Sequence, residues 1–89
     1  MEKSLTTREF RIFTELLRET RQRAGITQVE LSQLLKQTQS YISKVERGEC
    51  RLDIVQIRQF CLALKTTLSD FIAEYDSRLA ASRRSKKKS

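Results

Sequence analysis

One stretch of the chain decides the fold: residues 25–48 read GITQVELSQLLKQTQSYISKVERG, a segment enclosed by the only two glycines. Thr27 followed by Glu30 is a capping-box pattern, in which the two side chains satisfy unpaired N–H groups at the start of a helix. Thr38 is the next residue suited to cap a helix, and the second glycine ends that helix. The stretch therefore predicts two short helices joined by a turn, the arrangement of a helix-turn-helix unit over 27–47.

The second of these helices, predicted at 38–47, has one side built from amide, hydroxyl and cationic side chains. At about 100° per residue these side chains fall within an arc of about 140°, while Ile42 and Val45 fall on the other side. Such groups match the donors and acceptors of base edges and phosphates in the major groove. A plain solvated face is the alternative, but the arc lacks any carboxylate that would repel phosphate, so we predict that it faces DNA. Its members are Gln39, Ser40, Ser43, Lys44 and Arg47.

Three more helices are expected around this unit, because the chain has no Pro, only two Gly and regularly spaced apolar residues. The first starts from a capping pattern at Thr6 and Glu9 and ends at Gly25. The fourth starts from Asp53 and the fifth from Thr67. The fold class predicted is all-α, a compact five-helix bundle. The expected inward-facing residues are Phe10, Phe13, Leu17 and Ala24, then Leu31 with Leu34 or Leu35, then Ile54, Ile57, Phe60, Cys61 and Leu64, and finally Leu68, Phe71, Ile72, Tyr75 and Leu79.

Composition excludes most enzymatic chemistry. The chain has no His and only two Cys, Cys50 and Cys61, so it lacks an imidazole metal ligand, a catalytic Ser-His or Cys-His pair and a zinc-binding set. It also lacks a Gly-rich phosphate loop. We predict no catalytic residue, no metal and no cofactor. No stretch approaches the about 20 apolar residues of a membrane span, so a cytoplasmic protein is expected.

Positive charge is concentrated towards the C-terminal end. The chain holds 18 Lys and Arg against 11 Asp and Glu, but residues 1–82 hold 13 of the basic and all 11 acidic ones. We expect an N-terminal extension and cap at 1–9, the DNA-binding domain at 10–80 and a disordered basic tail at 81–89. The tail either aids solubility as a solvated terminus or adds non-specific phosphate contacts as an arm. Its basic residues are Arg83, Arg84, Lys86, Lys87 and Lys88.

Two charges fall on apolar helix faces. Arg21 lies one turn beyond Leu17 on the inward side of the first helix, and Glu46 lies beside Ile42 on the inward side of the third. A charge on an apolar face needs a partner, and each of these residues supplies what the other lacks. We therefore predict a structural ion pair between Arg21 and Glu46.

Two motifs give the chain a resemblance to a known family. They are Arg21-x3-Gly25-Ile26-Thr27-Gln28-x-Glu30-Leu31 and the segment TQSYISKVERG at 38–48. Both are similar to the Cro/CI-type (XRE family) helix-turn-helix proteins, and the resemblance extends over about 17–72. It implies a lambda-repressor-like bundle whose third helix enters the major groove of double-stranded DNA, usually as a dimer on a palindromic operator.

The resemblance also implies roles for single residues. The positions that match the family's base-reading residues are Gln39, Ser40, Ser43 and Lys44. Contacts to phosphate are implied for Gln28, Arg47 and Arg51, to which we add Thr38 and Tyr41. Lys36 and Lys65 stand where the family usually has glycine, so either Lys36 takes an unfavourable φ or the turn differs slightly.

A helix-turn-helix module of this size covers only one half-site, so specific affinity normally requires two copies. We expect a two-fold interface through the fourth and fifth helices, which would set the recognition helices about 34 Å apart. The alternative is that the fifth helix folds back onto its own core. The candidate interface residues are Val55, Leu62, Ile72, Tyr75 and Leu79.

Two functions from different classes follow from these features. The first is a sequence-specific DNA-binding transcriptional regulator that acts as a homodimer. The second is a protein-interaction module, such as an antitoxin that binds a toxin partner and also represses its own operon. Substitution of Lys44 or Gln39 separates them, because it should abolish operator binding and leave a protein complex intact.

Overall fold

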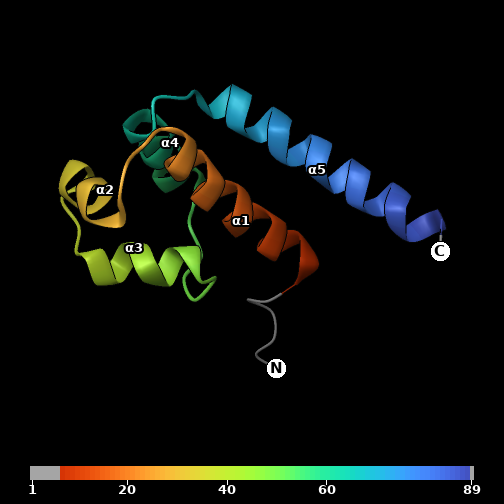
Figure 1. The fold of residues 1–89 in the computed structure, drawn as a ribbon, viewed down its shortest axis with the longest axis horizontal. Coiled ribbons are helices and arrows are strands. Elements are labelled where there is room, and N and C mark those ends of the chain that lie inside the picture. The colour runs from red at the N-terminus through yellow and green to blue at the C-terminus, as the bar shows by residue number, and fades with distance from the viewer. Residues whose placement is uncertain (1–6, 89) are drawn as a thin grey trace.

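The computed structural model describes the backbone of residues 7–88 and the side chains of residues 7–82. It contains five helices: α1 (Arg8–Arg23), α2 (Gln28–Leu35), α3 (Gln39–Glu46), α4 (Ile54–Ala63) and α5 (Leu68–Lys88). The described part of the chain has no strand, so the predicted all-α five-helix fold is confirmed. In Figure 1, α1 lies in the middle of the molecule, with α2 and α3 on one side and α5 on the other.

All five helices start in the same way, with a side-chain oxygen that accepts a hydrogen bond from the backbone N–H three residues later. These acceptors and their distances to the donating nitrogen are Thr7 (3.2 Å), Thr27 (3.1 Å), Thr38 (3.0 Å), Asp53 (2.8 Å) and Thr67 (3.0 Å). The prediction had placed the first cap at Thr6, which lies outside the described residues. Because α1 begins at Arg8, it is Thr7 whose hydroxyl reaches the N–H of the third helical residue.

Four of the helices also end in the same type of turn. A residue just past each end has a positive φ: Gly25 at 73°, Lys36 at 57°, Gly48 at 80° and Lys65 at 65°. The following N–H then donates to the carbonyl five residues back, as in the 2.8 Å bond from Gln37 to Ser32 and the 2.9 Å bond from Glu49 to Lys44. Two lysines therefore occupy the left-handed region, and of the two alternatives for Lys36 the unfavourable φ is confirmed.

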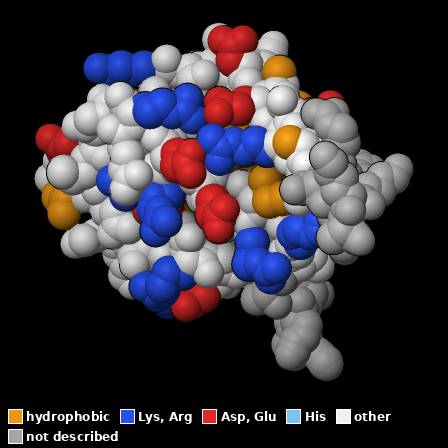
Figure 2. All heavy atoms as spheres, turned by 45° about the vertical axis from the view of Figure 1, so that its right-hand side comes forward, with side chains coloured by type: hydrophobic (Ala, Val, Ile, Leu, Met, Phe, Trp, Pro, Cys, Tyr) orange, Lys and Arg blue, Asp and Glu red, His pale blue; other side chains and the backbone are white. Residues whose placement is uncertain are grey.

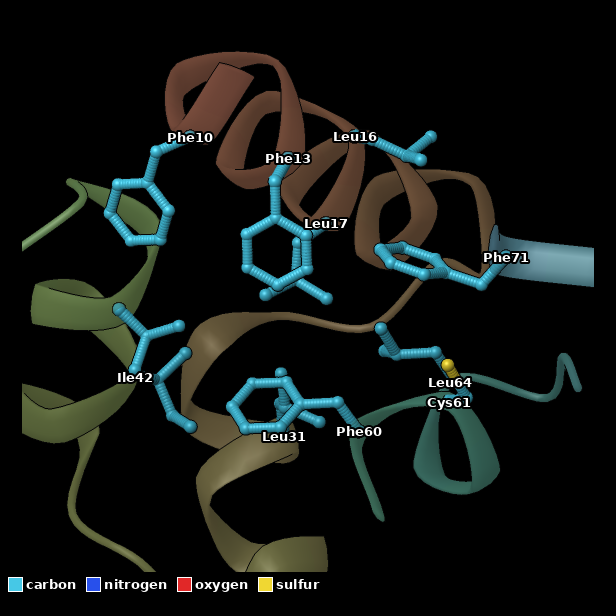
Figure 3. Close-up of a cluster of buried hydrophobic side chains, with 11 residues drawn as sticks. Phe10, Phe13, Leu16, Leu17, Leu31, Ile42, Phe60, Cys61, Leu64 and Phe71 are labelled. Atoms are coloured by element: carbon cyan, nitrogen blue, oxygen red, sulfur yellow. The ribbon is translucent and has the colours of Figure 1, made fainter. Parts of the chain in front are cut away.

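The core lies between α1 and the other four helices. Its side chains converge from all five helices in Figure 3. Phe13 is at its centre, with the Phe71 ring edge-on at 5.8 Å and the Phe10 ring stacked at 5.9 Å between centroids. The buried hydrophobic residues are Phe10, Phe13, Leu16, Leu17, Leu31, Ile42, Val45, Phe60, Cys61, Leu64 and Phe71.

The expected inward faces were wrong at two positions, Ile54 and Ile72. Leu34 and Leu35 were alternatives, and it is Leu35 that packs against the core, whereas Leu34 is 57% exposed. Ile54 is 58% exposed because it is the first residue of α4 and precedes the turns that reach the core. Ile72 is 39% exposed, because its neighbour Phe71 takes the position against Phe13.

The last helix is longer than expected. The prediction ended it near residue 80 and assigned 81–89 to a disordered tail, whereas the α5 backbone is helical to Lys88 (Figure 1). No Gly or Pro interrupts this segment, and Ala, Arg and Lys are good helix formers. The basic side chains of the tail, expected either to be solvated or to contact phosphate, lie outside the described side chains. Over the described residues, no helix combines the length and the apolar character needed to cross a membrane.

We expect Lys36→Gly and Lys65→Gly each to raise the free energy of unfolding by about 0.5–1 kcal/mol. A left-handed φ costs a side-chain-bearing residue about 1–2 kcal/mol, and the larger unfolded-state entropy of glycine offsets part of this. Urea denaturation followed by circular dichroism measures the change.

Gly25→Ala is the matched control for these two variants. Gly25 has a φ of +73° and no heavy atom within 4 Å of an added Cβ, so only backbone strain opposes the methyl group. This variant should lower the free energy of unfolding by about 1 kcal/mol. Unchanged or lowered stability of both lysine variants would contradict the assignment of strain at these turns.

Candidate nucleic-acid interface

A charged cluster joins α1, α2 and α3. The Arg21 Nε donates to Glu46 Oε2 at 2.7 Å, and the Arg21 Nη2 donates to Glu46 Oε1 at 3.1 Å. Gln28 Nε2 adds a third hydrogen bond to Glu46 Oε1 at 3.0 Å, and the Arg21 Nη1 donates to the Ile26 carbonyl at 2.8 Å. The Arg21 and Glu46 side chains are only 11% and 3% exposed. The ion pair expected from the sequence therefore forms at a nearly closed site.

The outer side of α3 carries the residues expected to face DNA. Ile42 and Val45 are fully buried on its inner side. The arc on the other side is exposed at Gln39, Ser40, Lys44 and Arg47 and half-buried at Ser43. All five predicted residues therefore lie on one surface, because this segment has the helical spacing of about 100° per residue that the prediction assumed.

The first residue of α3 is linked to the buried cluster. Gln39 Nε2 lies 3.5 Å from Gln28 Oε1, a long and weak hydrogen bond. The Gln28 amide is itself oriented by its bond to Glu46. A chain of polar contacts therefore runs from Arg21 in α1 to the exposed end of α3. One of the two Gln28 N–H groups is used inside the protein, which leaves the other for the phosphate contact expected of it.

The remaining predicted phosphate-contact residues are held in different ways. The Thr38 hydroxyl caps α3 and accepts the Tyr41 N–H at 3.0 Å, so it keeps its own proton to donate. Tyr41 is half-buried against the core and lines a small pocket that it shares with the end of α2 and with α4. Burial raises the pKa of its phenol, with smaller contributions from Cys50 and Asp53. The exposed guanidinium of Arg51 lies 4.9 Å from the centroid of the Phe10 ring.

Arg47 has an acidic neighbour that sequence analysis missed. Its Nε and Nη2 donate to the two carboxylate oxygens of Glu49 at 3.0 and 3.2 Å, and its Nη1 donates to Ser43 Oγ at 2.6 Å. The hydrogen bond and the opposite charge raise the pKa of Arg47 and lower that of Glu49. The helical wheel did not find Glu49, because this residue follows the turn at Gly48 and lies outside α3.

The interface candidates on α4 and α5 separate into two groups. Val55 and Leu62 are 62% and 58% exposed, and Ile72 is exposed as well. Tyr75 instead packs edge-on against Phe13 at 5.9 Å and donates its hydroxyl to the Glu9 carbonyl at 3.0 Å. Leu79 is half-buried. At Tyr75 the fifth helix folds back onto its own core, which was the alternative expectation.

Charges of both signs hold α1 against α5. Arg78 contacts Glu19 at 2.7 Å and Glu74 at 3.2 Å, and Arg23 contacts Glu74 at 3.2 Å. Figure 2 shows a face on which Lys and Arg side chains lie next to Asp and Glu side chains. Such a mixed surface attracts phosphate less than the α3 arc does, since the arc itself holds cations and no carboxylate.

Comparison with known proteins agrees with this geometry. Residues 12–71 match the family described as "Helix-turn-helix domain". The structure resembles that of an XRE-family like protein from Pseudomonas syringae pv. tomato str. DC3000, with 34% sequence identity and a TM-score of 0.73 over 79% of this chain and 85% of that one. The chain belongs to the helix-turn-helix domain family. Within it, this is an XRE-type DNA-binding protein.

Two crystal structures of the clp gene regulator ClgR from Corynebacterium glutamicum are also similar. One has 24% identity and a TM-score of 0.75 over 85% of this chain and 81% of that one, a likeness of fold. The other has 26% identity and a TM-score of 0.67 over 74% of this chain and 85% of that one. The search of curated proteins finds no match.

We expect Glu46→Ala to lower the free energy of unfolding by about 3–5 kcal/mol, because it leaves the nearly buried Arg21 without its partner. Arg23→Ala is the control, since it removes an exposed pair, 56% and 40% exposed, and should cost about 0–1 kcal/mol. Urea denaturation measures both. Equal losses for the two variants would contradict the role of the cluster as the junction of three helices.

Proposed function

We propose that this DNA-binding transcription regulator acts as a homodimer on a palindromic operator, with α3 in the major groove of double-stranded DNA. The observation that carries the proposal is the α3 surface. It presents amide, hydroxyl and cationic side chains on one side, and Ile42 and Val45 anchor the other side in the core. A helix held in this way offers a rigid set of donors and acceptors to the bases.

Base reading is assigned to four residues of α3. The Gln39 amide suits adenine, which presents one donor and one acceptor, and the Lys44 ammonium suits the two acceptors of guanine. The hydroxyls of Ser40 and Ser43 donate or accept and fit either base pair. Gln39 also makes a long, weak contact of 3.5 Å with the Gln28 oxygen.

Contacts to phosphate surround this group. Gln28 and Thr38 lie at the start of α2 and α3, and each keeps a free donor. Arg47 and Arg51 follow at the other end of α3. We also assign a phosphate contact to the Tyr41 hydroxyl, although its ring packs against the core. These contacts position the protein on the duplex and carry no sequence information themselves.

Dimerisation is assigned to the exposed apolar residues of α4 and α5. One α3 helix spans only a few base pairs, so two copies are needed for specific affinity. Val55, Leu62 and Ile72 are exposed, and so is Ile54, which sequence analysis had placed in the core. Val55 and Leu62 lie two turns apart on one side of α4, and a contiguous patch of apolar side chains is typical of an interaction surface. A two-fold axis through this surface would set the two α3 helices about 34 Å apart.

Selection of bound sites from a random duplex library, at about 150 mM salt, tests the proposal. We expect an inverted repeat to be enriched, with half-sites separated by about one helical turn. Recovery of unselected sequences would contradict specific recognition. It would favour the alternative of a protein-interaction module, and a search for a protein partner would follow.

Lys44→Ala should relax the preference at one position of each half-site and cost about 1–3 kcal/mol there, because a single base contact is lost. Lys65→Ala is the matched control: it removes the same charge from an exposed residue outside α3. Competition binding with single-base operator variants separates the two. A loss that is equal for all sequences would mean that Lys44 contacts phosphate and reads no base.

Leu62→Glu should convert the dimer to a monomer. Because specific affinity is assigned to two copies, it should also weaken operator binding. Leu34→Glu introduces the same change at a leucine of nearly equal exposure on α2, 57% against 58%. Sedimentation velocity reports the oligomeric state, and circular dichroism reports folding. A Leu62→Glu protein that remains dimeric would contradict the assigned interface.

A further inference from the structure

An ion pair already occupies one of the cations assigned to phosphate. The Arg47 guanidinium holds both carboxylate oxygens of Glu49, through Nε at 3.0 Å and Nη2 at 3.2 Å. This two-point geometry is the one with which arginine binds phosphate. In the DNA-free protein, the guanidinium edge suited to a phosphate is therefore taken by an internal anion.

The helix end places Glu49 beside Arg47. Gly48 has a φ of 80°, and the Glu49 N–H donates to the Lys44 carbonyl at 2.9 Å. These two features turn the chain back towards the last turn of α3. Glu49 is therefore held at the edge of the surface assigned to DNA by backbone geometry, in addition to its contact with Arg47.

Glu49 differs in this from Glu46, the acidic residue within α3. Glu46 is 3% exposed and enclosed by Arg21 and Gln28, so its charge is neutralised inside the protein. Glu49 is 53% exposed, as is its partner Arg47 at 54%. Arg47 lowers the pKa of the Glu49 carboxyl, first by its hydrogen bond, and Lys44 contributes through its charge. Glu49 is consequently ionised at neutral pH and open to solvent.

We propose that Glu49 competes with DNA phosphate for Arg47 and so lowers the affinity of the protein for DNA of any sequence. This inference rests on the function proposed above. A phosphate reaches the guanidinium edge only after the carboxylate leaves it, and an exposed pair of this kind reduces binding by about two- to fivefold.

Release of Arg47 also affects base reading. Its Nη1 donates to Ser43 Oγ at 2.6 Å, and Ser43 is one of the four residues assigned to bases. When a phosphate draws the guanidinium outward, the Ser43 hydroxyl loses this donor and gains freedom to reorient. The contact to phosphate and the contact to the base at this end of α3 are therefore coupled through one side chain.

The test uses Glu49→Gln in the full chain, which keeps the shape of the side chain and removes its charge. We expect affinity for a random-sequence duplex to rise about two- to fivefold. Asp76→Asn is the matched control, since it changes the net charge equally at an exposed position on α5.

The decisive comparison repeats both substitutions in a protein that also carries Arg47→Ala. If Glu49 acts by occupying Arg47, Glu49→Gln should change affinity in this background no more than Asp76→Asn does. An equal rise with and without Arg47 would overturn the proposal and indicate a general charge effect. Wild type and Glu49→Gln binding DNA with equal affinity would overturn it as well. If wild type binds no duplex DNA, the proposed function itself fails, and this inference fails with it.

Discussion

The Glu46 carboxylate is the point on which the arrangement of the first three helices depends. An ionised carboxylate that is 3% exposed is stable only if hydrogen bonds replace its lost hydration. It receives two from Arg21 on α1 and one from Gln28 on α2. Apolar packing tolerates small shifts of one helix against another, whereas these short polar contacts do not. The cluster therefore fixes the orientation of α3 relative to α1 and α2.

The α1–α5 contact rests on apolar packing more than on charge. Phe71 and Tyr75 both meet the Phe13 ring edge-on, and such aromatic contacts retain their strength when salt screens the surface. The pairs that Arg78 forms with Glu19 and Glu74 are exposed, and pairs of this kind contribute little to folding. Of the two pairs, only Arg78–Glu19 joins α5 to α1, because Glu74 and Arg78 lie one turn apart on α5.

Local signals in the sequence predicted more of this structure than long-range ones did. The caps at Thr27, Thr38, Asp53 and Thr67 depend on residues three positions apart, so they could be recognised without a fold. Arg21 with Glu46 is a long-range contact that was also predictable, because each charge stood on an apolar face and needed an opposite partner.

The features that the sequence could not predict depend on how the helices pack against one another. Ile54 has the periodicity of a core residue, but α4 approaches the core only after its first turn. Tyr75 was expected both on the inward face and at a dimer interface, and its contact with Phe13 depends on how α5 lies against α1. The position of Glu49 beside Arg47 was not predicted for a third reason. It results from the turn at Gly48, and helical periodicity does not extend past that turn.

The surface assigned to DNA has two ends that differ in the partners of their side chains. At the start of α3, the Gln28 amide is oriented by a nearly buried carboxylate, and Gln39 reaches Gln28 only through a weak contact of 3.5 Å. At the other end, Arg47 is held by short hydrogen bonds to Glu49 and Ser43, but its pair with Glu49 is exposed. A buried partner keeps its place when DNA arrives, whereas an exposed pair exchanges with solvent and allows the cation to move to a phosphate. The division therefore assigns a fixed orientation to Gln28 and an adjustable contribution to affinity to Arg47.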